Sequence, residues 1–298
     1  MASGAQVIVF RAKLQKLLIA TLLLAGLVFL MLQSQTKASD NTLTIGSKNC
    51  TEQHILAEIL AQLVETHTDL KVKRLFNLEG TSICFNALKS RTIDVYFEYT
   101  GTALLDILKE PLKQGPLYPY LKEVFAKQNL SYLDPLSFSN QYVLIARADS
   151  SLHNISDIPP HVRIAIDPEL AARKDLKLLQ QAYMINQQPK LMDQVLLYFS
   201  LQNNAIDVMS GFSTDGRLKS SEFRALIDDR KALPNYVAAP LVRKEVLEQH
   251  PQLISVFVRL KDQIEDSEIS DLNYQVETLG YNVPSVVRKF LKDAIVSL

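Results

Sequence analysis

The stretch "IDVYFEYTGT", residues 93–102, joins a strand-like run to a polar turn that contains a glycine. Residues 93–99 are mostly β-branched or aromatic, which is typical of a buried strand. A buried strand does not need the threonines and the glycine that follow it. The question is what this turn does at the end of the strand.

A second stretch repeats the same plan. "LKSRTIDVYFEYTG" ends a first set of expected strands and helices, and "LQNNAIDVMSGFSTDG" ends a second set. In both, Ile-Asp-Val is followed by an aromatic residue six positions after the isoleucine, Tyr99 in the first and Phe212 in the second, and then by Thr and Gly. A chance match of "IDV" is the alternative. Ligands bind at the carboxyl ends of strands in open α/β sheets, so two such ends predict a cleft lined by aromatic rings.

Strand and helix patterns alternate on both sides of these stretches, which indicates an α/β fold with parallel sheets. The first set is expected to contain strands at 42–47, 70–78 and 93–99, and helices at 50–67 and 80–90. The second is expected to contain strands at 141–147 and 162–167, and helices at about 169–182 and 189–203. The tail is expected to return with a strand at 236–243 and helices at about 244–265, 268–279 and 283–297.

The N-terminus has the pattern of an export signal. Three basic residues precede an uncharged apolar run over 17–32, and small residues follow at 36–38. This order is typical of a secretory signal peptide, and an uncleaved membrane anchor is the alternative. Either way we expect the rest of the protein to be periplasmic or otherwise extracytoplasmic. No cysteine directly follows the apolar run, so a lipoprotein is not expected.

Composition argues against several classes of function. The 298 residues suffice for about two domains. Four of the 32 basic residues precede residue 39, which leaves 28 basic and 32 acidic residues after it, and no basic stripe for a nucleic-acid partner. No phosphate-binding loop, dinucleotide fingerprint or hydrolase motif is present, and the five histidines are scattered. We therefore expect that the protein is not an enzyme and that it has no cofactor and no metal site. Cys50 is the one candidate for a catalytic nucleophile.

An aromatic cleft is suited to a cation. Quaternary ammonium groups bind well on ring faces because they cannot donate hydrogen bonds. The chain has 11 Tyr and 12 Phe but no Trp, so any such cage consists of Tyr and Phe rings, and most of the others belong to the core.

Several motifs resemble one family, the substrate-binding proteins of ABC transporters for glycine betaine, choline and carnitine. The resemblance runs from about Leu43 to Leu291 and includes "LTIGSKNCTEQHILAEILAQL", "GTSICFNAL", "IDVYFEYTGTAL", "STDGRL", "YVAAPLVRKEVLEQHPQL" and "LNYQVE". It implies an α/β type II periplasmic binding protein, in which two lobes joined by a two-segment hinge close around a small quaternary amine. It also implies delivery of this ligand to an ABC permease in the membrane.

The same resemblance implies the domain boundaries. Residues 1–38 would be the signal peptide or anchor. The first lobe would be discontinuous, with residues 39–138 and 233–298, and the second lobe would comprise residues 139–232.

The family's ligand site maps onto positions of this chain one by one. "TEQ" places Gln53, and "EYTGT" places Tyr99 and Thr102, with Gln53 and Thr102 at the polar end of the ligand. Two motifs are altered: "NQY" stands for "NTY" and keeps Tyr142, and "FSTDGR" stands for "YSTDGR", so that Phe212 replaces a tyrosine. The remaining candidates are Tyr118, with Tyr120 as its rival, and Asp215 and Tyr236.

A cysteine pair is a further departure from the family. Cys50 stands where the family usually has Phe, and Cys84 lies at the start of the next helix. The loops that precede these two helices meet at one edge of a parallel sheet, so a Cys50–Cys84 disulfide is possible in an exported chain. Two small buried side chains are the alternative.

Two other functions remain open from the sequence. A receptor for an ordinary amino acid would pair an arginine with the ligand carboxylate and an acid with its amine. Arg217 is the one arginine within a repeated motif, and a structural role for it is the alternative. A sensor or scaffold domain held by an uncleaved anchor is the other.

Overall fold

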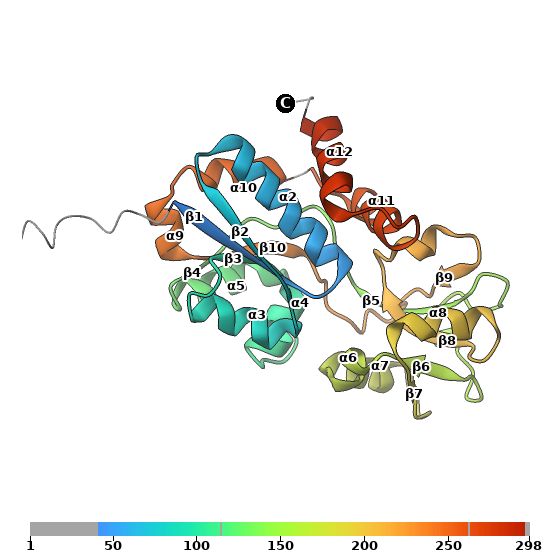
Figure 1. Cartoon of the computed structure of the whole chain (residues 1–298). Coiled ribbons are helices and arrows are strands. Elements are labelled where there is room, and N and C mark those ends of the chain that lie inside the picture. Colours follow the sequence, from blue (N-terminus) through green and yellow to red (C-terminus); the bar gives the residue numbers. More distant parts are fainter. Residues whose placement is uncertain (1–40, 114, 262, 296–298) are drawn as a thin grey trace, which may run out of the picture. The chain divides into compact units, whose positions relative to one another are not determined.

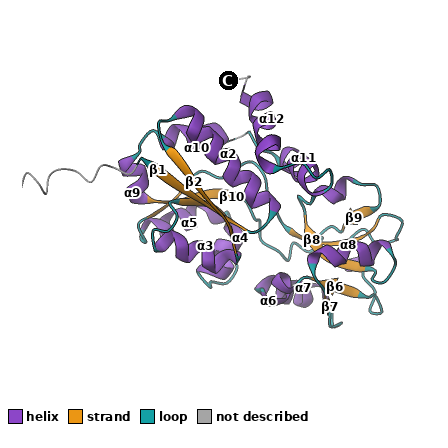
Figure 2. Ribbon diagram, in the orientation of Figure 1, coloured by secondary structure: helices purple, strands orange, loops and turns teal. Residues whose placement is uncertain are grey.

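The computed structural model describes residues 41–113, 115–261 and 263–295. Its strands form two five-stranded sheets (Figures 1 and 2). Contacts between backbone segments group Leu43–Leu298 into one unit that holds both sheets.

The first sheet has the strand order β2-β1-β3-β10-β4. Its strands are β1 (Thr42–Lys48), β2 (Lys71–Leu78), β3 (Val95–Tyr99), β4 (Leu130–Tyr132) and β10 (Ala238–Arg243). All five residues of β3 are buried, as expected for a central strand covered on both faces. Strand β10 comes from the far end of the chain and lies antiparallel between β3 and β4.

Helices cover both faces of the first sheet (Figure 1). On one face, the apolar side of α2 packs against β1 and β3 together with α10, α11 and α12. On the other face, α3 and α5 pack with the turn that follows β3. The helical segments on this sheet are α2 (Thr51–His67), α3 (Gly80–Lys89), α4 (Thr100–Thr102), the π-helical turn η1 (Ala103–Ile107), α5 (Leu117–Ala126), α9 (Lys244–Gln249), α10 (Leu253–Leu260), α11 (Asp266–Glu277) and α12 (Val283–Ile295).

The second sheet has the strand order β7-β6-β8-β5-β9. Its strands are β5 (Tyr142–Arg147), β6 (Ile164–Ile166), β7 (Lys190–Leu191), β8 (Val208–Phe212) and β9 (Phe223–Ala225). Helices α6 and α7 cover one face and α8 covers the other. The helical segments are η2 (Ile155–Asp157), α6 (Pro168–Ala172), α7 (Lys174–Tyr183), α8 (Gln194–Gln202) and η3 (Gly216–Lys219).

Both sheets are mixed, whereas the sequence pattern predicted parallel sheets. β1 and β3 are parallel, but β10 runs antiparallel to β3, and β5 runs antiparallel to β8. The antiparallel strands are the first ones that the chain forms after it passes from one sheet to the other. The start of each therefore lies beside the end of a strand that the repeat had singled out.

Three predicted helices are shorter or broken. The helix expected over 169–182 is interrupted at Arg173, whose backbone is extended with φ −92° and ψ 157°. The helix expected over 189–203 begins only at Gln194, after the short strand β7. The helix expected over 244–265 is divided into α9 and α10 at Pro251, which has no backbone N–H to continue a helix.

Candidate functional site

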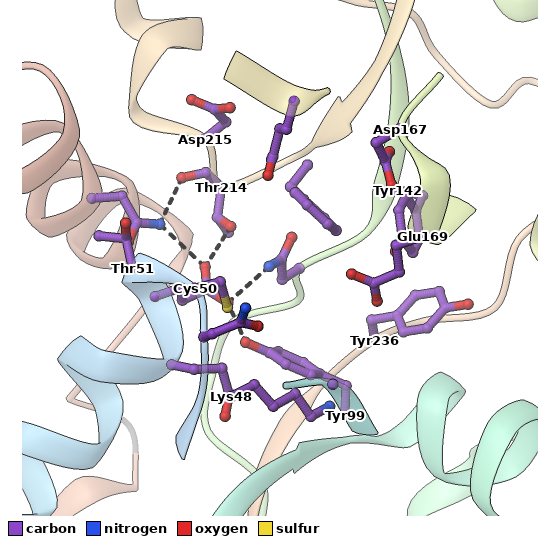
Figure 3. A pocket seen from close by; sticks show the side chains of 18 of the residues that line it. Lys48, Cys50, Thr51, Tyr99, Tyr142, Asp167, Glu169, Thr214, Asp215 and Tyr236 are labelled. Carbon is purple, nitrogen blue, oxygen red and sulfur yellow. Dashed lines mark hydrogen bonds between the residues drawn. The ribbon is translucent and has the colours of Figure 1, made fainter. Parts of the chain in front are cut away.

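A cavity of about 610 Å³ lies where the first and second sheets meet. Its lining comes from the N-terminus of α2, the end of β3, the start of β5, the α6–α7 junction and the loop after β8. Figure 3 shows Tyr99 and Lys48 on one side of this space and Tyr142, Glu169 and Tyr236 on another. The ends of β3 and β8, which the repeat marked, both line it.

Three rings of the cavity lie against one another. The centroids of Tyr142 and Phe212 are 4.7 Å apart, and those of Tyr142 and Tyr236 are 6.3 Å apart. Strand register explains the cluster: Tyr142 begins β5 directly opposite Phe212 at the end of β8. Tyr236 lies two residues before Ala238, the partner of Tyr99 in β10. The antiparallel strands thus bring each ring to the edge where β3 and β8 end.

The positively charged side chain of Arg173 lies over two of these rings. The guanidinium carbon of Arg173 is 5.0 Å from the Tyr142 centroid and 5.6 Å from the Tyr236 centroid. Arg173 is only 8% exposed, and its charge is balanced by Asp106 at 2.6 Å and Asp175 at 3.0 Å. The break between α6 and α7 places this side chain in the cavity.

A second cation lies beside Tyr99. The Lys48 ammonium is 5.5 Å from the Tyr99 centroid and pairs with the buried carboxylate of Glu98 at 2.6 Å. Glu98 also accepts hydrogen bonds from the Tyr96 hydroxyl and the Tyr99 backbone N–H. The glutamate of "EYTGT" therefore holds Lys48 next to the ring of the same motif.

The carboxylate of Glu52 lies buried in the cavity wall and accepts four hydrogen bonds. The donors are the Tyr99 hydroxyl, the Thr214 hydroxyl, the Asn140 amide at 2.8 Å and the Asn273 amide at 3.2 Å. Burial raises the pKa of Glu52, and the four hydrogen bonds oppose this shift. Burial also keeps the pKa of Tyr99 well above its ordinary value, so its hydroxyl stays protonated and donates to Glu52.

Buried polar atoms without partners also line the cavity. Gln53 is 1% exposed, and neither atom of its amide has a hydrogen-bond partner among the described residues; the same is true of the Tyr142 hydroxyl. The hydrogen bond that the Thr102 hydroxyl accepts from Arg173 is long, at 3.3 Å. Unpaired buried donors and acceptors are costly, so polar groups of a bound molecule would stabilise this part of the cavity wall by pairing with them.

The structure brings together most of the residues that the sequence singled out. The cavity is lined by Gln53, Tyr99, Thr102, Tyr142, Phe212, Asp215 and Tyr236. Asp215, however, is held by Arg217 in a two-pronged contact with distances of 2.8 and 2.9 Å. Arg217 in turn stacks on the Tyr198 ring at 3.8 Å.

Tyr118 and Tyr120 are not brought to this cavity. The Tyr118 hydroxyl donates to Asp134 at 2.7 Å, and its ring packs on Tyr132 beside the first sheet. The Tyr120 hydroxyl donates to Glu110. Both side chains are used in contacts of α5.

The cysteines are separate in the structure. Cys50 precedes α2 with an exposed surface at the cavity, and Cys84 is buried in α3; both are free thiols. The disulfide considered from the sequence is not formed, because Cys84 packs into the core under the first sheet.

Sequence reasoning missed Arg173, Glu52, Thr214 and Asn140. Three of them had a signal, because they stand inside the quoted motifs "TEQ", "FSTDGR" and "NQY", although only the neighbouring residues were chosen. No local signal marked Arg173, since "PELAARKDL" has the composition of a continuous helix.

The described part of the chain contains neither a metal-binding cluster nor a membrane-spanning helix. In the ranges 41–113, 115–261 and 263–295, no group of three or more His, Cys, Asp or Glu side chains is arranged to hold a metal ion. In the same ranges no helix combines the length and the apolarity needed to cross a membrane. The apolar run over 17–32 lies outside the described residues.

Two α/β sheets with a ring-lined cavity between them define a type II periplasmic binding protein. A crystal structure of a glycine betaine/carnitine/choline ABC transporter protein has the same fold, with a TM-score of 0.74 and 27% identity over 84% of this chain and 98% of that one. The predicted fold class is thereby confirmed.

Comparison with known sequences gives the family. Residues 41–293 match the model described as the substrate binding domain of the ABC-type glycine betaine transport system. A carnitine transport binding protein of Listeria monocytogenes is 31% identical, with 92% of this chain and 95% of that protein covered. An ergothioneine transport permease/ergothioneine binding protein of Helicobacter pylori is 32% identical over 90% of this chain, which spans 52% of that relative's length. The chain belongs to the family of substrate-binding domains of ABC-type glycine betaine transport systems, as the motifs indicated.

Proposed function

We propose that this protein is an extracytoplasmic receptor that binds a small betaine, a molecule with both a quaternary ammonium group and a carboxylate. The ring cluster of Tyr142, Phe212 and Tyr236 carries this proposal, because two of its rings already have a cation at 5.0 and 5.6 Å. A trimethylammonium group on a ring face gains about 0.5–2 kcal/mol per contact. Membership of the family supports the same ligand class.

Arg173 is suited to the anionic end of the ligand. Its Nη2 donates to the Thr102 and Tyr236 hydroxyls at 3.3 Å each, longer than the usual distance of about 2.9 Å. A ligand carboxylate would replace these weak neutral acceptors with charge-assisted hydrogen bonds. Gln53, with its free buried amide, would donate to the same end or to another polar group of the ligand.

This arrangement favours betaines over choline, which has a hydroxyl in place of a carboxylate. Glycine betaine, carnitine and ergothioneine all combine a quaternary ammonium group with a carboxylate. Carnitine and ergothioneine appear in the names of relatives 31% and 32% identical to this chain. The cavity of about 610 Å³ has room for any of the three.

The proposed transport cycle requires two lobes that move. We propose lobes of residues 39–138 with 233–298, and of residues 139–232, each built on one of the two sheets. Closure around the ligand would create the form that an ABC permease recognises, and residues 1–38 would export or anchor the receptor. The name of the Helicobacter relative, which joins a permease and a binding protein, supports a permease as partner.

An amino-acid receptor is the second candidate, and one observation favours it. Arg173 lies in the cavity near the acidic residue Glu169, with 3.7 Å between guanidinium and carboxylate. An arginine and an acid side by side are what an α-carboxylate and an α-ammonium would need.

Titration calorimetry of the purified protein separates these functions. The panel comprises glycine betaine, carnitine, ergothioneine, choline and a set of amino acids. Saturable binding of a betaine without binding of amino acids supports the proposal. Binding of amino acids alone assigns Arg173 and Glu169 to an amino-acid site and the rings to the core.

A further inference from the structure

Five separate motifs of the sequence converge on the carboxylate of Glu52. Glu52 belongs to "TEQ", and its four donors belong to "EYTGT" (Tyr99), "NQY" (Asn140), "FSTDGR" (Thr214) and "LNYQVE" (Asn273). Figure 3 labels two of these donors, Thr214 in the upper part of the view and Tyr99 in the lower part. The donors extend from the end of the first sheet to the loop of the second.

The carboxylate has no remaining acceptor site for a ligand. An ionised carboxylate offers about four lone-pair sites, and Oε1 and Oε2 each accept two hydrogen bonds from the protein. Glu52 is also only 5% exposed. Its contribution to binding must therefore act through the groups that it holds.

Those groups carry the rings of the cavity. Tyr99 is itself a lining ring. Thr214 follows Phe212 by two residues, and Asn140 precedes Tyr142 by two residues. The carboxylate of Glu52 therefore fixes the three segments that carry Tyr99, Phe212 and Tyr142. The last two of these rings belong to the second sheet.

The fourth donor, Asn273, belongs to helix α11. The amide of Asn273 donates to Glu52 and also to the backbone carbonyl of Thr214 at 2.9 Å. The loop from β8 thus contacts Glu52 through a side chain and α11 through its backbone. Opening the cavity between the sheets would require breaking this set of contacts.

We propose that Glu52 is a positioning residue that holds the two sheets in the ligand-binding arrangement by fixing Tyr99, Asn140 and Thr214 around one carboxylate. It does not touch the ligand. Its loss lets the loop over 212–217 separate from α2, so that the rings no longer enclose the cation together. For the ligand this inference rests on the proposed function, but the motion of the loop can be measured without ligand.

The test compares Glu52→Gln with Glu58→Gln. Glu58 is a matched control because it is buried on the same helix, 3% exposed, but pairs with Arg74 at 2.7 Å on the first sheet only. A glutamine at position 52 turns one acceptor oxygen into a donor that faces existing donors. We expect Glu52→Gln to weaken binding of glycine betaine, carnitine or ergothioneine by about tenfold or more, since hydrogen bonds to a charged group are lost. Glu58→Gln should leave the Kd within about twofold.

Hydrogen exchange of the ligand-free protein gives a readout that a general loss of stability would not reproduce. The backbone N–H groups of Ser213 and Asp215 donate to Gln141 and Phe212 at 2.9 and 3.1 Å. We expect Glu52→Gln to speed exchange in the peptide 212–217 selectively, and Glu58→Gln not to do so. Unchanged exchange in Glu52→Gln would overturn this inference, whether or not the wild type binds any ligand of the panel. A wild type that binds none of the ligands would refute the proposed function, and the exchange result would still decide the role of Glu52.

A double-mutant cycle tests whether Glu52 acts on ligand binding through Thr214. Thr214→Val removes one donor at nearly constant shape, and Thr214→Ser restores it. If Glu52 acts through Thr214, then Thr214→Val weakens binding and speeds exchange in the wild type but changes little in the Glu52→Gln background. Equal effects in both backgrounds, or no rescue by serine, would show that the two residues act independently.

Discussion

The guanidinium carbon of Arg173 lies 5.0 Å from the centroid of the Tyr142 ring. The two residues come from different elements of the second sheet, the α6–α7 junction and the start of β5. Their contact demonstrates that a ring face in this cavity accepts a cation. It also places a fixed positive charge beside the site proposed for a trimethylammonium group, so that the opposite end of a betaine has a partner close by.

Removing the Tyr142 ring should weaken binding of every quaternary ammonium ligand. One cation–π contact contributes about 0.5–2 kcal/mol, so Tyr142→Ala should raise the Kd by about 2- to 30-fold. Tyr142→Phe separates the ring from the hydroxyl, because it keeps the ring and removes only the hydroxyl, which has no partner among the described residues. Calorimetry decides: a Phe variant as weak as the Ala variant would assign the effect to the hydroxyl.

Changing Arg173 should separate betaines from choline. Arg173→Lys keeps a positive charge near Asp106 and Asp175, which limits the cost of leaving buried carboxylates unpaired. It loses the fork that suits a ligand carboxylate. We expect glycine betaine and carnitine to lose about tenfold or more in affinity, as for a hydrogen bond between charged groups, and choline to lose much less. An equal loss for all three ligands would mean that Arg173 only shapes the cavity.

Local sequence patterns were enough to single out two rings of the cavity lining, Tyr99 and Phe212, for a physical reason. Tyr99 and Phe212 stand at the ends of β3 and β8, and strand ends are local features that side-chain patterns reveal. Tyr142 and Tyr236 came from the motifs of the family resemblance. Their common position became clear only with the antiparallel register, which pairs Tyr142 with Phe212.

Arg173 shows what local patterns cannot reveal. "PELAARKDL" consists of good helix formers, yet the chain is extended at Arg173 so that its guanidinium contacts Asp106, 67 positions earlier in the sequence. Long-range charge pairing prevails there over helix propensity. Tyr118 is the converse case: the motif suggested a ligand ring, but its hydroxyl donates to Asp134 and its ring packs on Tyr132.

Glu52 should impose a pH dependence on stability. Burial raises its pKa in the folded state above the ordinary value of 4.5. Between pH 4.5 and the raised pKa of the folded state, Glu52 is protonated in the folded chain and ionised in the unfolded chain. The contribution of Glu52 to the free energy of unfolding is therefore present at low pH and lost as pH rises through the raised pKa.

Denaturant titrations of the ligand-free protein at about pH 5 and about pH 8 check this sign. Glu52→Gln has no proton to lose, so its free energy of unfolding should improve relative to the wild type as pH rises. A relative change in the opposite direction would mean that the four hydrogen bonds outweigh burial and lower the pKa of Glu52.

Gly216 should be intolerant of even one added methyl group. A Cβ on Gly216 would lie 2.4 Å from the Cα and from the backbone nitrogen of Tyr274, so that η3 packs directly against the backbone of α11. Backbone of a packed helix cannot move aside cheaply. We expect Gly216→Ala to lower the free energy of unfolding by about 1–3 kcal/mol and to weaken ligand binding, because the Thr214 loop would be displaced from Asn273 and Glu52.

Gly211→Ala is the comparison, since its Cβ would meet the terminal Cδ1 of Ile145 at 2.3 Å, the flexible end of a side chain. Denaturant unfolding and calorimetry on both variants measure the difference; a similar loss in both would show that the close approach of η3 to α11 has no special role in the binding arrangement.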